Sequence, residues 1–199
     1  MTITIANVTL AQSNSDSTPT TTSVKVQAGG GNSTLPYTIL NPQSVQVKAG
    51  QSVMWYNPSK VGEPHTVTFA LDNKTRPDLS ATFAVRNSSS FTPIPSNSTS
   101  EPLIVPNHQN PSMSMILGSN AVASNPVVID SAGNVKHLEK NAAYSVKGNE
   151  KLVNSGMIFP QGMGPPNGST SFTLTFGKAG TYDYYCILHP WQKGNIIVQ

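Results

Sequence analysis

The chain has 199 residues and a formal net charge of +3, and 11% of its residues are Asp, Glu, Lys or Arg. Its length and its 37% hydrophobic content suit one domain with an insertion rather than two domains. Its basic residues form no dense run, which argues against a nucleic-acid partner, and no apolar stretch is long enough for a transmembrane helix.

The N-terminal segment, residues 1–35, is predicted to hold a first strand and a flexible linker. Residues 1–6 alternate apolar and polar side chains, as a half-buried strand does. Residues 11–23 are rich in Ser, Thr, Asn and Gln, a composition typical of a linker between an exported domain and a membrane anchor. The segment shows no signal peptide. We therefore expect an extracytoplasmic domain that a longer form of the protein could tether to a membrane.

The main domain is placed at residues 36–199, and its first strands follow from alternation of apolar and polar residues. The predicted strands are 44–48, 52–56 and 66–71. Gly50 and Asn57-Pro58 mark the turns between them. Trp55 is expected to pack in the core. These features favour an all-β domain.

The segment at about 72–156 lies between the first strands and the C-terminal motifs, and the family resemblance given below implies that it is a long insertion. Its short strand candidates are 81–85, 103–105 and 127–129. Val135, Leu138, Ala142 and Val146 would share one helix face, so a short helix is predicted over 135–146. A second helical turn would end at Gly156.

The insertion also contains side chains that can bind metals, namely His108, Met113, Met115 and His137. No Cys or carboxylate lies at ligand spacing from them, so we interpret them as surface histidines and core methionines rather than as a second metal site. A flap beside the main site, or an oligomer contact, is an alternative role for the insertion.

The C-terminal part is predicted to form an apolar loop over 157–168 and three further strands. The strands are 171–176, 180–186 and 195–198. The loop is rich in Gly and Pro and could cover one end of the domain. The second of these strands ends at the only cysteine of the chain.

That cysteine, Cys186, is followed three residues later by His189 and then by Pro190. A single Cys excludes an internal disulfide, and a thiolate beside imidazoles is the donor set of electron-transfer copper sites. The third strong donor must come from elsewhere in the chain. His65 is the best candidate, because strict alternation follows it and places it at the entry to a strand.

These motifs resemble the cupredoxin family of type 1 copper proteins, in its plastocyanin- and amicyanin-like form. The segment 180–186 (GTYDYYC) matches the family's cysteine strand, and 47–57 (VKAGQSVMWYN) matches the segment that precedes the first histidine. Cys186, His189 and Gln192 align with the family's short Cys-x-x-His-x-x-Met loop. The overall character is similar to cupredoxins of ammonia-oxidising archaea. The resemblance implies a Greek-key β-sandwich.

Two positions differ from the family pattern. Gln192 stands where the short loop has Met, and this resembles sites in which a Gln amide oxygen is the axial ligand. Water, Met157 or Met163 are the alternatives at that position. Thr66 follows the first histidine, where the family often has an Asn that links the two ligand loops, and its hydroxyl can make one such bond.

The resemblance implies one copper ion held by His65, Cys186 and His189, with Gln192 as a weak axial ligand, in a carrier of single electrons. Redox partners would dock on an apolar patch near His189 and Trp191. The alternative is a copper enzyme acting on nitric oxide or nitrite at an open axial position. Copper storage or delivery, and a catalytic zinc site, are further alternatives.

Overall fold

The computed structural model describes residues 23–71, 83–85, 100–106, 114–120, 125–165, 168–189 and 191–199. In the three short segments between 83 and 120, the backbone alone is described. The described residues form fifteen strands, β1 to β15, and no helix. The all-β prediction is therefore confirmed for this part of the chain.

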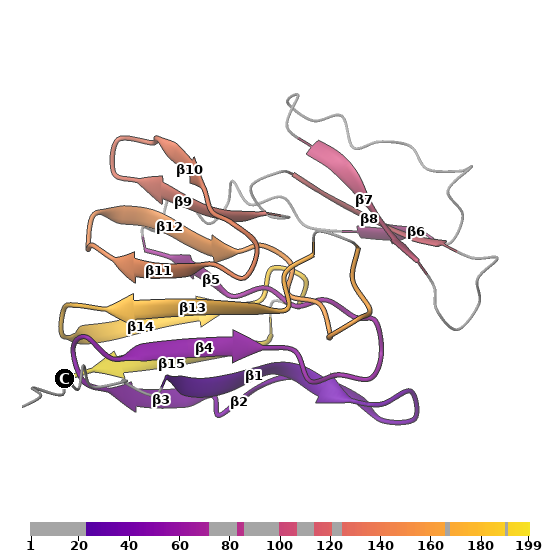
Figure 1. Ribbon diagram of the computed structural model, residues 1–199, viewed down its shortest axis with the longest axis horizontal. Helices are drawn as coiled ribbons and strands as arrows, with labels where there is room; N and C mark the ends of the chain where they lie inside the picture. The colour runs from indigo at the N-terminus through magenta and orange to yellow at the C-terminus, as the bar shows by residue number, and fades with distance from the viewer. Residues whose placement is uncertain are drawn as a thin grey trace, which may run out of the picture.

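The first sheet has five strands in the order β11-β13-β4-β1-β2, and it faces the viewer in Figure 1. Its strands are β1 (Val24–Gly31), β2 (Pro36–Asn41), β4 (Ser52–Tyr56), β11 (Ala143–Val146) and β13 (Ser171–Phe176). The sheet is mixed, because β1 runs parallel to β4 and antiparallel to β2. An irregularity in the β1–β2 pairing lies between Ala28 and Gly30.

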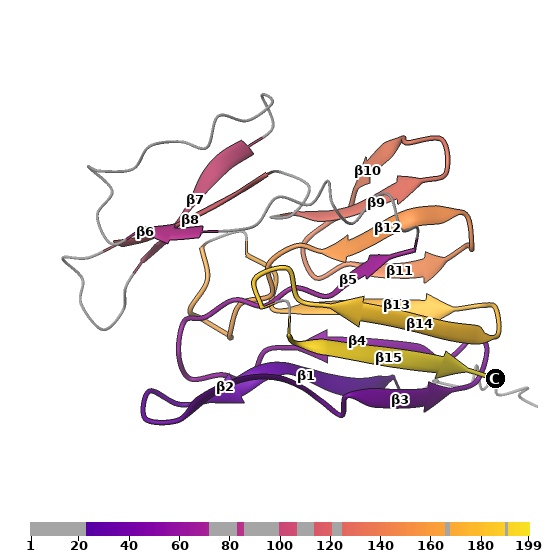
Figure 2. The same cartoon turned by 180° about the vertical axis from the view of Figure 1, so that it is seen from behind.

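The second sheet has seven strands in the order β10-β9-β12-β5-β14-β15-β3. Figure 2, seen from behind, brings its strands β14 and β15 to the front. The strands are β3 (Ser44–Val47), β5 (Thr68–Ala70), β9 (Pro126–Asp130), β10 (Val135–His137), β12 (Glu150–Ser155), β14 (Gly180–Tyr185) and β15 (Lys193–Val198). The β5 and β14 strands are neighbours, which matters for the site described below.

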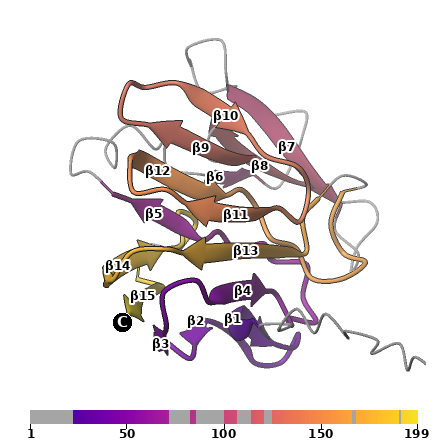
Figure 3. The same ribbon diagram turned by 60° about the vertical axis from the view of Figure 1, so that its left-hand side comes forward.

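The core lies between these two sheets, as the stacked ribbons in Figure 3 indicate. Trp55 of β4 is fully buried, and its ring meets Phe69 of β5 at 5.8 Å and Tyr184 of β14 at 5.3 Å, both edge to face. Aromatic pairs of this kind contribute about 0.5–1.5 kcal/mol each beyond the area that they bury. The alternation read from the sequence therefore directs one face of each strand into a shared aromatic core.

A third sheet has the order β6-β8-β7. It comprises β6 (Phe83–Val85), β7 (Ser100–Pro106) and β8 (Ser114–Asn120). The β6, β7 and β9 strands coincide with the strand candidates of the predicted insertion, whereas β8 was not expected from the sequence. Met115 lies in β8, and His108 and Met113 fall outside the described residues.

The two predicted helices are wrong. Val135–His137 is strand β10, antiparallel to β9, and Ala143–Val146 is strand β11, parallel to β13. Between them Asn141 has a φ of 56°, in the left-handed region, which ends any right-handed helix. The turn expected to end at Gly156 is strand β12, which pairs with both β5 and β9.

Two further features were not expected from the sequence. Strand β1 begins upstream of residue 36 and is hydrogen-bonded to both β2 and β4. Strands β9 to β12 fall within 72–156, yet they extend both main sheets. The predicted strand at 1–6 and nearly all of the predicted linker at 11–23 lie outside the described residues. Within the described residues, no helix has the length and apolar character needed to cross a membrane.

Candidate metal centre

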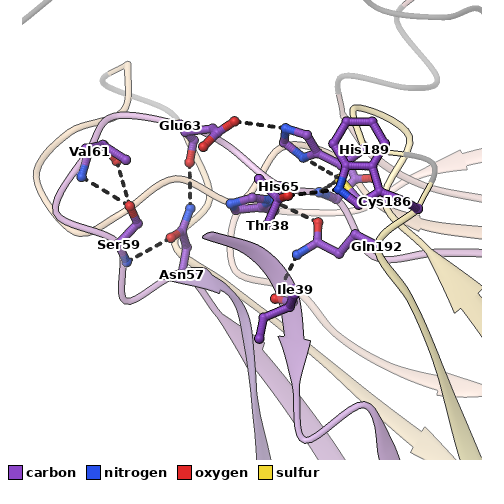
Figure 4. A network of polar contacts seen from close by, with 12 residues as sticks. Thr38, Ile39, Asn57, Ser59, Val61, Glu63, His65, Cys186, His189 and Gln192 are labelled. Atoms are coloured by element: carbon purple, nitrogen blue, oxygen red, sulfur yellow. Dashed lines mark hydrogen bonds and ion pairs between the residues drawn. The ribbon is translucent and has the colours of Figure 1, made fainter. Parts of the chain in front are cut away.

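Three buried side chains from distant parts of the chain meet at one end of the sandwich. The donor atoms of His65, Cys186 and His189 all lie within 4.8 Å of one another. His65 precedes β5 and Cys186 directly follows β14, and the pairing of Tyr185 with Thr68 joins these strands at that end. Sheet pairing therefore brings the first histidine to the cysteine, as Figure 4 shows.

Backbone hydrogen bonds hold His65, Cys186 and His189 in place. His65 exchanges two of them with Ile158, at 3.1 Å and 2.7 Å. The amide of Cys186 donates to the carbonyl of Gln192 at 2.9 Å, and the amide of Gln192 donates to the carbonyl of His189 at 2.8 Å. The second histidine thus sits in a closed turn that starts and ends beside the cysteine.

The surroundings of the Cys186 sulfur favour its thiolate form. It accepts a hydrogen bond from the Thr66 amide at 3.2 Å and lies 3.5 Å from His189 Nδ1. Burial raises the pKa of the Cys186 thiol, but the hydrogen bonds from His189, His65 and Thr66 and the nearby charge of His65 outweigh it and bring this pKa down to about 6. Because the thiolate is the form that binds metals, these contacts favour the ligating form of Cys186.

Thr66 links the two ligand loops. Its hydroxyl accepts a hydrogen bond from the amide of Ile187 at 2.8 Å, in addition to the bond from its own amide to the sulfur. The hydroxyl also contacts that of Thr68 at 3.1 Å, which in turn donates to Asn154 Oδ1 at 2.8 Å. All three side chains are buried, so a Thr in the usual Asn position still connects the loops.

Gln192 turns its amide oxygen into the site. Its Nε2 donates to the carbonyl of Ile39 in β2 at 2.9 Å, and its Oε1 lies 3.0 Å from His65 Nδ1. A carbonyl only accepts, so the NH₂ group must face Ile39 and the oxygen must face His65. The side chain is 2% exposed and therefore has one well-defined place.

These residues fit a metal ion. Nitrogen, oxygen and sulfur donors bind metals at about 2.0–2.3 Å, so two donors on one ion lie roughly 3–3.7 Å apart. The separations of 3.5 Å between Cys186 Sγ and His189 Nδ1, and of 3.0 Å between His65 Nδ1 and Gln192 Oε1, fall in this range. One thiolate with two imidazoles and a weak further donor is the set of an electron-transfer copper site.

The sequence matches two curated proteins over a short segment, and no family model matches the chain. Amicyanin from Paracoccus denitrificans is 48% identical over 29 residues, and amicyanin from Paracoccus versutus is 45% identical over 29 residues. Each match covers 15% of this chain and 22% of the relative's length. The donor set and this match together support the cupredoxin family.

Solved cupredoxin structures were also found. A Cu(I) form of an amicyanin variant gives a TM-score of 0.37 with 16% identity, covering 89% of this chain and 82% of that one. The purple cupredoxin from Nitrosopumilus maritimus gives a TM-score of 0.35 with 17% identity, covering 88% of this chain and 99% of that one.

Gly29 in β1 is a part of the candidate metal site that the sequence analysis missed. A Cβ at this position would lie 1.9 Å from His65 Nε2, so the bare backbone makes the space that the ring occupies. Gly29 also has a φ of +78°, which other residues adopt at a cost. The run Gly29-Gly30-Gly31 at the end of a strand was the available signal, since glycines within strands mark close approach of another group.

Glu63 is the second residue of the candidate metal site that the sequence analysis missed. Its Oε1 lies 2.9 Å from Nε2 of His189, whose side chain is 11% exposed. The hydrogen bond from His189 holds the pKa of Glu63 below its usual value, against the effect of burial. Burial lowers the pKa of His189, but its bonds to Cys186 and Glu63 outweigh this and raise the pKa to about 9. A carboxylate two residues before His65 was the one available signal.

Proposed function

We propose that the chain is a type 1 copper protein that carries single electrons between redox partners. His65, Cys186 and His189 would hold one copper ion, which cycles between Cu(I) and Cu(II) when bound by such donors. The observation that carries the proposal is the convergence of these three buried donors within 4.8 Å. Their burial also supports exclusion of water from the site.

The residues around the donors support a carrier rather than an enzyme. An electron carrier needs donors that move little between oxidation states. The Thr66 link and the backbone bonds of His65 and Cys186 resist such movement. We propose Gln192 Oε1 as the weak axial donor, because the amide bond to Ile39 aims this oxygen at the pocket. The alternative of a nitric oxide or nitrite enzyme needs an open axial position, and no described residue favours it.

We propose that redox partners dock beside His189 and Trp191. The Trp191 side chain is 67% exposed, and its ring lies 5.4 Å from the ring of His189. Its Nε1 donates to Thr38 Oγ1 at 2.9 Å, which fixes the indole against β2. Ile39 of the same strand is 55% exposed. An exposed apolar surface next to a ligand histidine suits a weak, short-lived redox partner.

We also propose an extracytoplasmic location, on the cell surface or in a periplasm-like space, and an archaeal origin. The composition of residues 11–23 supports an exported, tethered domain. A metal ligand also accounts for a lone cysteine in such a compartment, where a free thiol would otherwise be exposed to oxidation. The archaeal origin rests on the sequence resemblance alone.

The absorption spectrum of the copper-loaded protein tests the proposed function. The wild type is expected to show an intense thiolate-to-copper band, and Cys186→Ser is expected to lose it. His137→Ala serves as a control, because His137 is exposed in β10 and should keep the band. A wild type without this band, or a Cys186→Ser variant that keeps it, would contradict a copper–thiolate site. Addition of azide or nitric oxide should leave the spectrum unchanged if the axial position is filled.

A further inference from the structure

The two histidines of the site are held in different ways at their outer nitrogens. His65 Nε2 faces the backbone of Gly29, in a space that a Cβ would fill. His189 Nε2 instead meets the Glu63 carboxylate at 2.9 Å. Among the described residues this is the one ion pair involving a histidine. The more exposed ring, His189, therefore has an anionic partner, whereas the enclosed ring of His65 packs against the backbone of Gly29.

The contact fixes which nitrogen of His189 is free to bind a metal. In the metal-free protein each ring nitrogen faces an acceptor, with Cys186 Sγ 3.5 Å from Nδ1 and Glu63 Oε1 2.9 Å from Nε2. A carboxylate only accepts, so the hydrogen at Nε2 remains there. Nδ1, which faces the Cys186 sulfur, is therefore the nitrogen left to bind a metal. The hydrogen bond at one ring nitrogen thus sets the role of the other.

Hydrogen bonds within the loop that carries Glu63 fix the position of this residue. Asn57, which is 5% exposed, donates through Nδ2 to the carbonyl of Glu63 at 2.8 Å and to that of Ile158 at 3.1 Å. Its Oδ1 accepts from the amide of Ser59 at 3.0 Å, and Ser59 in turn bonds both the amide and the carbonyl of Val61. Figure 4 shows this network beneath the carboxylate. The backbone of Glu63 is therefore fixed before its side chain reaches His189.

The charge of Glu63 has a further consequence. A divalent ion with one thiolate leaves one net positive charge at the site, and a carboxylate hydrogen-bonded to a ligand imidazole offsets it. With a monovalent ion the thiolate alone would balance the charge, so the carboxylate would leave the site with one net negative charge. By Coulomb's law the carboxylate favours the oxidised state. It also makes the imidazole a stronger donor, as carboxylate partners of ligand histidines do.

We propose that Glu63 is a positioning residue that holds His189 in its ligating form and lowers the reduction potential of the centre. The inference rests on the proposed function for its redox part, and on geometry alone for its binding part. The contact with His189 distinguishes Glu63 from the acidic residues elsewhere on the surface. Glu139, which is exposed, provides a matched position for removing the same charge.

The test compares Glu63→Gln, Glu63→Ala and the control Glu139→Gln in two measurements. The first is zinc affinity by chelator competition, which needs no redox chemistry. Glu63→Ala should bind zinc roughly 10- to 100-fold more weakly than the wild type, and Glu63→Gln less so, because an amide oxygen still accepts a hydrogen bond. The second is the reduction potential of the copper form, which should rise in Glu63→Gln and stay unchanged in Glu139→Gln.

The outcomes separate this inference from the proposed function. Weaker zinc binding in Glu63→Ala together with a raised potential in Glu63→Gln supports the inference. Wild-type zinc affinity in Glu63→Ala, or a wild-type potential in Glu63→Gln, overturns it. If the copper-loaded wild type lacks the thiolate band, the electron-carrier proposal fails. The zinc comparison still decides the positioning role in that case, and thermal melts of all variants check that each one folds.

Discussion

Replacing Gly29 with Ala is expected to disturb the site although it adds only a methyl group. The new Cβ would lie 1.9 Å from Nε2, 2.5 Å from Cδ2 and 2.7 Å from Cε1 of His65. No real contact is so short, so the ring must move. His65 is held by Ile158 on its backbone and meets Gln192 at its Nδ1, so movement of the ring breaks the donor arrangement.

Gly133 provides a control with the same backbone strain and no clash. Its φ is +89°, against +78° for Gly29, and an added Cβ would meet nothing within 4 Å. An L-residue in the left-handed region costs about 1–2 kcal/mol, which both substitutions share. Overpacking adds about 1–3 kcal/mol in Gly29→Ala alone. The unfolding free energy of Gly29→Ala should therefore fall by about 2–5 kcal/mol, and that of Gly133→Ala by about 1–2 kcal/mol.

Urea unfolding of the metal-free variants measures these losses, and zinc competition measures the effect on the site. We expect Gly133→Ala to bind zinc as the wild type does, and Gly29→Ala to bind it much more weakly. Equal losses of stability in the two variants, with unchanged zinc affinity in Gly29→Ala, would refute the claim that Gly29 makes room for the ring.

Three further changes have defined outcomes. Gln192→Met should raise the reduction potential, because a thioether favours Cu(II) less than an amide oxygen does; voltammetry showing a lower potential would contradict an axial role. Thr66→Val should lose about 1–3 kcal/mol in urea unfolding, since the buried amide of Ile187 loses its acceptor; no loss would mean that this link is dispensable. Burial raises the pKa of Glu150, but bonds from the Lys147 amide and from the Tyr144 hydroxyl outweigh it and lower the pKa overall. The stability that Glu150 contributes is therefore present above its unfolded-state pKa and lost as the pH falls through the folded value. The stability gap between wild type and Glu150→Gln should narrow below about pH 4.5, and a gap independent of pH would exclude this assignment.

The three side chains that cluster could be singled out from the sequence because local patterns mark them. Cys186 and His189 lie three residues apart at the end of an alternating strand, and His65 precedes another such strand. The strands β4 and β13 also coincide with the predicted segments, because their burial alternates strictly along the chain. The residue types and the period-two alternation were enough to predict these side chains and the strands β4 and β13.

The remaining parts depend on contacts that no local pattern encodes. Glu63 meets His189 across 126 positions, and Gln192 meets Ile39 across 153 positions. A lone carboxylate in a loop, or a backbone carbonyl in a strand, carries no signal of such a partner. The predicted helix over 135–146 failed for a related reason. Its apolar spacing was real, but Val135 is 48% exposed and Ala142 is buried, so the residues do not share one face.

The five-stranded sheet contributes to the site through its main chain. Gly29 supplies a bare stretch of backbone, and Ile39 supplies a carbonyl oxygen. Alanine scanning of the β2 side chains leaves that oxygen in place, so such a scan would not report its bond to Gln192. Substitutions along β2 could therefore accumulate on the outer surface while the amide of Gln192 kept its orientation. A backbone ester at Leu40, which weakens the Ile39 carbonyl as an acceptor, would test this main-chain contribution to the site.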